Sequence, residues 1–144
     1  MIIPVSREHE KAWAELCVAL WPGDSVDEWI QEGRESEFEH QFLYQIEGEA
    51  IAFMSLSLRH DYVEGSETSP VGYLEGIYVK PEFQNRGIAR ELVEFAKKWS
   101  REKGCTQLAS DCEIDNDVSR EFHNKIGFQE AGTIVCFIMD LARK

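Results

Sequence analysis

The chain has 144 residues, of which 43% are hydrophobic and 29% charged, a composition typical of one globular domain. Its 27 acidic and 15 basic residues give a formal net charge of −12. This balance argues against a nucleic-acid partner, because phosphate binding needs a basic surface, and it favours cationic ligands instead.

Several other classes of protein are also disfavoured. No segment reaches the length of a membrane span, and the N-terminus lacks the basic and apolar regions of a signal peptide, so we expect a cytoplasmic protein with no membrane partner. Neither the four cysteines nor the four histidines have the spacing of a zinc or redox site. We therefore expect free thiols and no metal.

The first half of the chain predicts a strand, two helices and a hairpin. Ser6 is expected to begin the first helix and Trp21-Pro22-Gly23 to end it, and Asp24 or Ser25 caps the second. Glu47-Gly48-Glu49 predicts a tight turn. In chain order we expect a strand at Ile2–Val5, a helix from Ser6 to about Leu20, a helix from Val26 to about Gly33, and strands at Gln41–Glu47 and Ala50–Arg59.

The second half predicts a strand–helix–strand unit, which pairs its strands in parallel through a right-handed crossover. Gly104 and Gly127 are expected to end two helices, and Asn116 caps the second of them. The expected elements are strands at Val71–Val79, Thr106–Cys112 and Thr133–Leu141 and helices at Asn85–Lys103 and Asn116–Ile126. The order β-α-α-β-β-β-α-β-α-β contains no repeat or linker, so residues 1–144 are predicted to form one domain.

The junction after the strand Val71–Val79 has the features of a phosphate-binding site. There the sequence Gln84-Asn85-Arg86-Gly87-Ile88-Ala89 opens a helix, whose first N–H groups lack intrahelical acceptors and carry partial positive charge. Gly87 lets a ligand approach the backbone, and Arg86 and Arg90 add positive charge. The alternative is a helix start that binds nothing.

The spacing Gln84-x-x-Gly87-x-Ala89 after a strand resembles the coenzyme A loop of the GCN5-related N-acetyltransferases, the GNAT family. The order of elements resembles this family over essentially the whole chain. The resemblance implies an α/β fold, with a central mixed, mostly antiparallel sheet flanked by helices, and acetyl-CoA as cosubstrate. The implied cofactor-binding residues are Ile77, Tyr78, Val79, Gln84, Asn85, Arg86, Gly87, Ile88, Ala89, Arg90 and Asn116.

The family's cofactor strand, here Val71–Val79, splays from its neighbour, so that the backbone of Ile77, Tyr78 and Val79 would bind the pantetheine arm and the acetyl carbonyl. The developing oxyanion would be stabilised by the same N–H groups. Gly76 would permit a bulge that causes the splay.

Five further segments resemble the aminoglycoside 6′-N-acetyltransferases within this family. They are Leu20-Trp21-Pro22-Gly23, Arg59-His60-Asp61-Tyr62-Val63 with Ser69-Pro70-Val71, Leu74-Glu75-Gly76-Ile77-Tyr78-Val79, Ala109-Ser110-Asp111 with Asn116, and Phe122-His123-Asn124-Lys125-Ile126-Gly127-Phe128. The resemblance implies acetyl transfer to the 6′-amine of an aminoglycoside by direct attack in a ternary complex, and hence antibiotic resistance. The implied substrate-binding residues are Trp21, Asp24, Tyr62, Glu75 and Asp111.

Glu75 is the candidate catalytic residue, because the substrate amine is protonated near neutral pH and must lose a proton before it can attack. A carboxylate among apolar strand residues needs a partner. Strict alternation places Glu75 on the same face as Tyr73, Ile77 and Val79. Glu75 could accept the proton directly or through water, or only bind the ammonium, and an ion pair with a neighbouring strand is the structural alternative.

The remaining candidate residues each have a structural alternative too. Asp111 follows a strand end, where open α/β sheets bind ligands, but it could equally be a solvated or capping residue. Trp21 and Tyr62 offer flat faces for sugar rings, although Trp21 could be a core residue. His123 is a second candidate catalytic residue, since it occupies the place where many relatives carry a tyrosine general acid and could protonate the departing thiolate, but it could equally be an ordinary exposed helix histidine. Asn116 could contact the coenzyme or only cap its helix.

Two other functions remain open at this stage. The first is acetyl transfer to another small amine, such as a polyamine, or to a protein amine, and the second is a non-catalytic acyl-CoA-binding module. The strand Thr133–Leu141 is rich in β-branched and apolar residues and could be shared across a homodimer, as in similar enzymes, or could lie inside a monomer.

Overall fold

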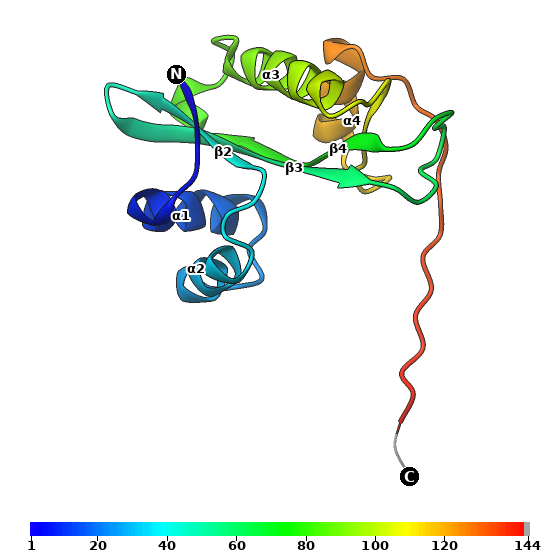
Figure 1. Ribbon diagram of the computed structural model, residues 1–144, viewed down its shortest axis with the longest axis horizontal. Coiled ribbons are helices and arrows are strands. Elements are labelled where there is room, and N and C mark those ends of the chain that lie inside the picture. Colours follow the sequence, from blue (N-terminus) through cyan, green and yellow to red (C-terminus); the bar gives the residue numbers. More distant parts are fainter. Residues whose placement is uncertain (143–144) are drawn as a thin grey trace. The chain divides into compact units, whose positions relative to one another are not determined.

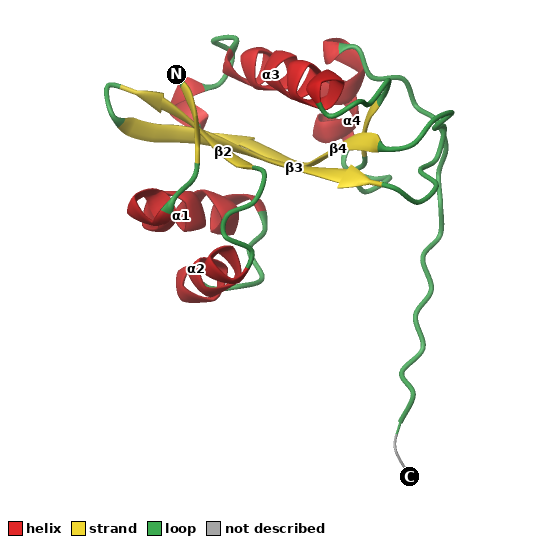
Figure 2. Ribbon diagram, viewed as in Figure 1, coloured by secondary structure: helices red, strands yellow, loops and turns green. Residues whose placement is uncertain are grey.

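The computed structural model describes residues 1–142, which divide into two compact units, Met1–Asp111 and the chain from Cys112 onward. Figure 1 labels the elements by name, and Figure 2 separates helices from strands. The first unit contains β1 (Ile2–Pro4), α1 (Glu10–Leu20), α2 (Val26–Glu35), β2 (Gln41–Ile46), β3 (Glu49–Arg59), β4 (Val71–Val79), α3 (Ile88–Glu102) and β5 (Leu108–Ser110), and the second contains α4 (Asp117–Ile126). The prediction of one domain for residues 1–144, of which 143 and 144 lie outside the described part, stays a prediction.

A mixed, mostly antiparallel sheet forms the centre of the first unit. Its five strands lie in the order β1-β2-β3-β4-β5, and only β4 and β5 pair in parallel. Helix α1 contacts β3 and β4 on one face and carries α2, while α3 contacts the same strands from the other face (Figure 1). The predicted fold class is therefore confirmed.

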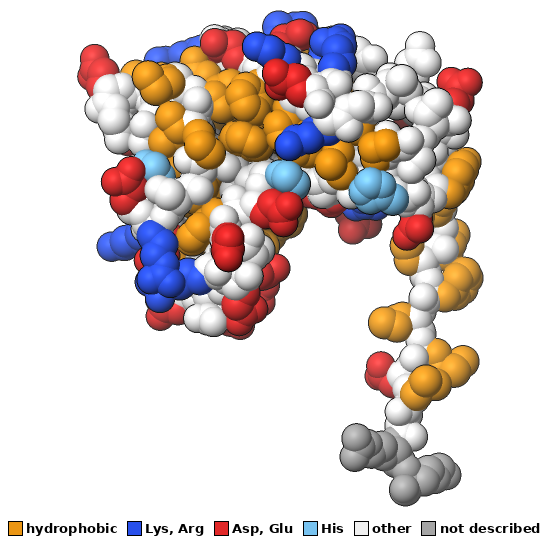
Figure 3. Space-filling model, viewed as in Figure 1, with side chains coloured by type: hydrophobic (Ala, Val, Ile, Leu, Met, Phe, Trp, Pro, Cys, Tyr) orange, Lys and Arg blue, Asp and Glu red, His pale blue; other side chains and the backbone are white. Residues whose placement is uncertain are grey.

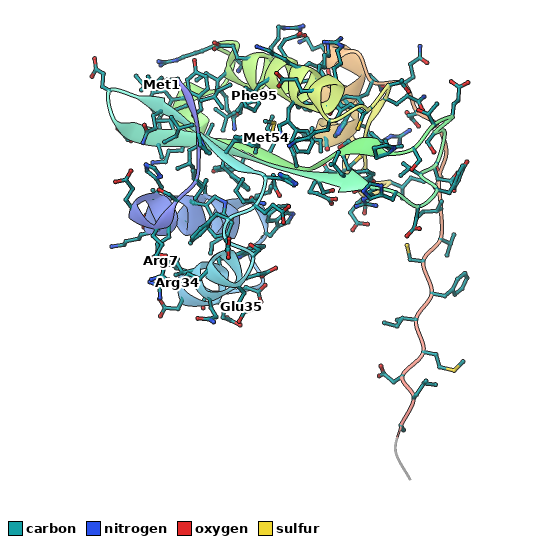
Figure 4. All side chains as sticks on the ribbon, in the orientation of Figure 1. Met1, Arg7, Arg34, Glu35, Met54 and Phe95 are labelled. Atoms are coloured by element: carbon teal, nitrogen blue, oxygen red, sulfur yellow. The ribbon has the colours of Figure 1, made fainter. Side chains whose placement is uncertain are left out.

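Apolar side chains on both faces of the sheet make the core. Under α1, the buried cluster joins Trp13, Leu16, Cys17, Phe38 and Phe53 with their neighbours. Helix α3 is amphipathic, and it buries residues at helical spacing, which are Ile88, Leu92, Val93, Ala96, Trp99 and Ser100. Figure 4 shows the side chains of Met54 and Phe95 between the sheet and α3.

Helix α3 begins at Ile88, three residues later than predicted, because Asn85 and Gly87 have left-handed backbone conformations, with φ of 63° and 83°. The residues from Gln84 to Gly87 therefore form a loop ahead of the helix. The hairpin turn between β2 and β3 is as predicted, since Glu47 and Gly48 both have positive φ.

The second unit contains a capped helix and an irregular C-terminal segment. The Asn116 side chain accepts a hydrogen bond from the Ser119 N–H at 3.0 Å, and Gly127 ends the helix with φ of 115°. The predicted strand Thr133–Leu141 is wrong for this structure, because its described residues form no strand ladder. A strand needs a neighbour for its backbone groups, and apolar β-branched residues alone do not supply one.

A membrane-spanning segment would need a long apolar helix, and none of the helices within residues 1–142 has that character.

Candidate active site

A bulge in β4 decides which of its side chains share a face. The pairing with β3 runs from Ser55 opposite Gly76 to Leu56 opposite Leu74, so β4 has one extra residue, Glu75. A Cβ on Gly72 would meet the Ser100 side chain of α3, whereas a Cβ on Gly76 would meet Trp21 at the end of α1. Before the bulge, the even-numbered residues of β4 therefore face α3, as Gly72 does. After the bulge, the even-numbered residues face α1, as Gly76 does.

The face predicted for Glu75 is right in part. Glu75 and Tyr73 both contact Arg59 of β3, so they share a face. Tyr78 packs against the buried cluster under α1, and its strand neighbours Ile77 and Val79 point to the other face. The prediction is wrong for those two residues, because strict alternation takes no account of the bulge.

Glu75 is held by donors from the neighbouring strand. Arg59 Nη2 lies 2.9 Å from both carboxylate oxygens, Arg59 Nε lies 3.2 Å from Oε2, and the Ser57 hydroxyl also donates to Oε2. The Arg59 side chain is 42% exposed and that of Glu75 is 33% exposed. The ion pair that the sequence left as an alternative is therefore present, and Glu75 remains reachable from solvent.

Tyr73 connects this ion pair to a second carboxylate. The Arg59 guanidinium carbon lies 3.4 Å from the centroid of the Tyr73 ring, and the Tyr73 hydroxyl donates to Asp111. Burial raises the pKa of the Tyr73 phenol, and the hydrogen bond to Asp111 raises it further. The phenol stays protonated near neutral pH, so it can keep donating to Asp111. Asp111 is therefore joined to Glu75 through Tyr73 and Arg59.

Trp21 lies against the backbone of β4 beside the bulge. Its indole occupies the space that a side chain at position 76 would fill, and its ring stacks on Trp29, with centroids 5.3 Å apart. The ring also meets Phe53 edge-on at 5.8 Å. Trp21 is half-buried. Trp21 is therefore part of the core, which was the structural alternative for this residue. Part of its side chain still faces solvent next to β4, the strand that carries Glu75.

The predicted cofactor loop lies between β4 and α3. Gln84 Nε2 donates to the Val79 carbonyl at 3.0 Å, which ties the loop back to the end of β4. The N–H groups of the first turn of α3, beginning at Ile88, have no intrahelical acceptors. The Arg86 guanidinium carbon lies 5.2 Å from the centroid of the Phe83 ring. Figure 3 shows lysine and arginine side chains gathered over α3. These groups fit the phosphates of coenzyme A.

Strand β4 is only partly paired on its β5 side. Within the described residues, β5 pairs with Gly72, Tyr73 and Leu74 alone, although β4 continues to Val79. The backbone beyond Leu74 therefore has no β5 partner along the edge that the predicted pantetheine contacts would use. The bulge predicted from Gly76 is present, but it lies in the β3–β4 ladder.

Two predicted substrate residues lie in exposed loops. Asp24 is exposed between α1 and α2, and Tyr62, 74% exposed, lies between β3 and β4. The Tyr62 hydroxyl accepts a hydrogen bond from the Gly65 N–H at 3.4 Å. No hydrogen bond or ion pair between described residues joins either side chain to Glu75.

The candidates in the second unit have local partners. His123 Nδ1 lies 2.7 Å from the Ser119 carbonyl oxygen, which favours the tautomer that carries a proton on Nδ1. The same imidazole contacts the rings of Phe122 and Phe128. The Asn116 side chain caps α4, which is the structural role that the sequence offered as the alternative to a coenzyme contact.

Sequence reasoning missed Arg59, Ser57 and Tyr73. Ser57 and Arg59 are spaced by two on one strand, a pattern that indicates a shared face. The sequence could not pair them with Glu75, because the long loop before Val71 leaves the β3–β4 register undefined and the bulge shifts it. Among residues 1–142, no group of His, Cys, Asp and Glu side chains is arranged to hold a metal ion.

Known proteins resemble this chain over nearly its full length. The acetyltransferase (GNAT) family matches residues 6–128. The aminoglycoside N(6′)-acetyltransferase type 1 of Salmonella typhimurium is 38% identical over 136 residues, which span 92% of this chain and 94% of that protein. The apo crystal structure of the aminoglycoside 6′-N-acetyltransferase AAC(6′)-Ig from Acinetobacter haemolyticus superposes with a TM-score of 0.92, at 39% identity over 99% of both chains.

A second solved structure is that of a relative with a bisubstrate analogue bound. AAC(6′)-Iy in complex with the bisubstrate analogue CoA-S-monomethyl-acetylneamine superposes with a TM-score of 0.90, at 36% identity over 97% of both chains. The predicted family is confirmed, and the chain belongs to the GNAT acetyltransferases, as a homologue of the type 1 aminoglycoside N(6′)-acetyltransferases.

Proposed function

We propose that this chain transfers the acetyl group of acetyl-CoA to the 6′-amine of aminoglycoside antibiotics. The observation that carries the proposal is the cluster in which Tyr73 and Arg59 join two solvent-reachable carboxylates, Glu75 and Asp111, at the bulge of the strand that leads to the coenzyme A loop. Two carboxylates suit a substrate with several ammonium groups. Homologues that match this chain over nearly their full length are named as aminoglycoside 6′-N-acetyltransferases.

The reaction is a direct transfer within a ternary complex. The 6′-ammonium loses a proton, and the neutral nitrogen then attacks the thioester carbonyl carbon. A C–N bond forms and the C–S bond breaks, and the sulfur leaves as a thiolate that takes up a proton. The products are the N-acetylated drug and coenzyme A, and one proton is released overall.

Each predicted residue has a role in this scheme. Glu75 and Asp111 bind the ammonium groups, and Glu75 begins the path by which the proton leaves. Trp21 and Tyr62 pack on the sugar rings, with Asp24 at the edge of the site. The loop Gln84–Arg90 binds the pyrophosphate, with Asn116 as a further coenzyme contact, while the backbone of residues 77–79 binds the pantetheine arm and the carbonyl oxygen. The imidazolium form of His123, with a proton on Nε2 as well as on Nδ1, would supply the proton to the departing thiolate.

Acetylation would protect a cell from the drug. It removes a positive charge from a ligand that binds ribosomal RNA through its cationic amines, so the drug's affinity for RNA falls. The enzyme would act in the cytoplasm, where acetyl-CoA and the ribosome are both present. Acetyl transfer to a polyamine or a protein amine, and a non-catalytic role in coenzyme A binding, are the competing functions.

A matched pair of drugs tests the proposal. Neomycin and paromomycin differ at the 6′ position, which carries an amine in the first and a hydroxyl in the second. We expect release of free coenzyme A thiol with neomycin and none above background with paromomycin. Activity on spermidine or on peptides without activity on neomycin would contradict the proposal, and so would coenzyme A binding without turnover of any amine.

Two isosteric variants test the site. Glu75→Gln and Asp111→Asn should lower kcat/KM for neomycin at least tenfold, since each removes a charge that binds the substrate's ammonium groups. The affinity for coenzyme A, measured by calorimetry, should stay within about twofold of the wild-type value, because the phosphate loop is unchanged. Glu10→Gln is the matched control, since Glu10 also accepts from an arginine, Arg34, but lies on α1. A loss as large in the control would contradict the assignment.

The C-terminal segment supports a homodimer as part of the proposal. Its apolar side chains are highly exposed, with Phe137 at 91%, Ile138 at 96% and Leu141 at 88%. Figure 3 shows hydrophobic side chains along this segment. A strand exchanged with a second copy would bury these side chains and pair their backbone groups. Light scattering should give twice the mass of one chain, and removal of residues 133–144 should give a monomer. A monomeric full-length chain at micromolar concentration would refute this part.

A further inference from the structure

The Arg59–Glu75 ion pair poses a problem for the proposed substrate site. Arg59 uses both Nη2 and Nε on the carboxylate that would bind the substrate's ammonium, and Ser57 adds a further donor. The Arg59 guanidinium carbon also lies 3.4 Å from the centroid of the Tyr73 ring, a second contact that holds the guanidinium beside Glu75. The Arg59 guanidinium therefore occupies the carboxylate of Glu75, to which the substrate's ammonium group is expected to bind.

The charge of the acceptor site follows from these contacts. Glu75 and Asp111 contribute one negative charge each, and Arg59 contributes one positive charge. The titratable groups in contact within this cluster are Glu75 and Tyr73 on β4, Arg59 on β3 and Asp111 after β5. Without Arg59 the site would carry two uncompensated carboxylates.

Two uncompensated carboxylates would hinder the chemistry while they help binding. A nearby negative charge stabilises the ammonium form of an amine, and only the neutral form attacks the thioester. A site that binds the cation too strongly would therefore keep the nucleophile protonated. A positive charge beside Glu75 opposes this effect.

We propose that Arg59 is the internal counter-ion of the acceptor site: by binding Glu75 it limits how strongly this carboxylate holds an ammonium group, and thereby keeps more of the bound amine in its neutral, nucleophilic form. Arg59 is thus a positioning residue that acts through Glu75. The inference rests on the proposed acetyl transfer to a cationic amine.

The decisive variant is Arg59→Gln, which keeps polar hydrogen bonding but removes the charge. At saturating acetyl-CoA and pH 7, we expect KM for neomycin to fall about threefold and kcat to fall about tenfold, because the pKa of the bound amine rises by about one unit. The pH at which kcat reaches half of its maximum should move upward by about one unit for the same reason. Arg59→Lys, which keeps the charge, should restore most of the pH profile.

Arg34→Gln is a matched control, because Arg34 also pairs with a glutamate through Nε and Nη2 and its side chain is 40% exposed (Figure 4). It lies on α2, and its replacement should leave KM, kcat and the pH profile unchanged. Neomycin binding without acetyl-CoA, measured by calorimetry, gives a second readout, in which Arg59→Gln should bind more tightly than the wild type.

The outcomes separate this inference from the proposed function. If the wild type acetylates neomycin, but Arg59→Gln binds the drug no more tightly and keeps the wild-type pH profile, the inference is overturned and the function stands. A rise in KM together with a fall in kcat would likewise reduce Arg59 to a structural link between β3 and β4. If the wild type acetylates no aminoglycoside, the proposed function fails first, and this inference fails with it before any variant is made.

Discussion

Replacing Gly76 by alanine tests how the bulge and Trp21 shape the proposed acceptor site. The added Cβ would lie 2.3 Å from Trp21 Cζ2, 2.5 Å from Cη2 and 3.0 Å from Leu20 Cδ2. Carbon atoms in contact lie roughly 3.5–4.0 Å apart, so the indole would have to move by about 1 Å or more. It cannot do so freely, because Trp29 stacks on it and Phe53 meets it edge-on.

The cost follows from this confinement. Overpacking a filled site destabilises a protein by about 1–3 kcal/mol, and we expect Gly76→Ala to lie in the upper half of that range. Urea unfolding followed by far-UV circular dichroism measures it. Because the displaced indole borders the Glu75 strand, KM for neomycin should rise at least threefold, while coenzyme A affinity stays unchanged.

A double-mutant cycle identifies the cause. Trp21→Phe removes the indole edge nearest to the new methyl group, so the double variant should be more stable than the two single effects predict, by about 1 kcal/mol or more. Gly72→Ala is the control, since its Cβ would meet the Ser100 side chain of α3 at 2.2 Å and leave Trp21 untouched. Additivity of Gly76→Ala and Trp21→Phe within about 0.5 kcal/mol would refute the reasoning.

Three further predictions concern other parts of the chain. Burial raises the pKa of the Cys17 thiol to about 12. At pH 8 this thiol should therefore stay unmodified by Ellman's reagent while the exposed Cys136 thiol reacts, and equal rates of modification would contradict the burial of Cys17. Gly87→Ala should lower stability by about 1–2 kcal/mol, because Gly87 has φ of 83°, and should also weaken coenzyme A binding in calorimetry. Ser25→Ala should cost about 1 kcal/mol in urea unfolding, since Ser25 caps α2, and leave kcat unchanged.

Elements with strong local signals could be predicted from the sequence. Ser25 caps α2 and Asn116 caps α4, and both roles depend on a side chain that accepts a backbone N–H two or three residues ahead. The Glu47-Gly48 turn was likewise predictable from residues that tolerate positive φ. These features depend on neighbours in the chain, so no knowledge of the tertiary structure was needed.

Features that depend on distant neighbours were predicted less well. The segment Thr133–Leu141 has the composition of a strand, but a strand also needs a partner ladder, and composition does not supply one. The start of α3 was placed three residues early, because Asn85 tolerates both helical and left-handed backbone. Helix propensity does not decide between the two conformations.

The candidate site shows the same division. Glu75, Asp111 and the predicted coenzyme A loop could be named from motifs, but the side chains that meet Glu75 depend on the β3–β4 register. The bulge at Glu75 places this carboxylate next to Arg59 and Ser57 and turns Ile77 toward the other face. One extra residue in β4 therefore changes which side chains meet, and no alternation pattern in the sequence predicts where that residue lies.

The bulge also bears on how β4 would serve the two substrates of the proposed reaction. From Gly72 to Leu74, β4 is paired on both sides, with β3 and β5, and beyond Leu74 it has no β5 partner among the described residues. Glu75, at the change, directs its carboxylate to the face that carries Tyr73 and Arg59. In the proposed reaction, the bulge turns Glu75 toward the amine, and the backbone beyond Leu74, which has no β5 partner among the described residues, would receive the thioester, so the two substrates would meet along one strand.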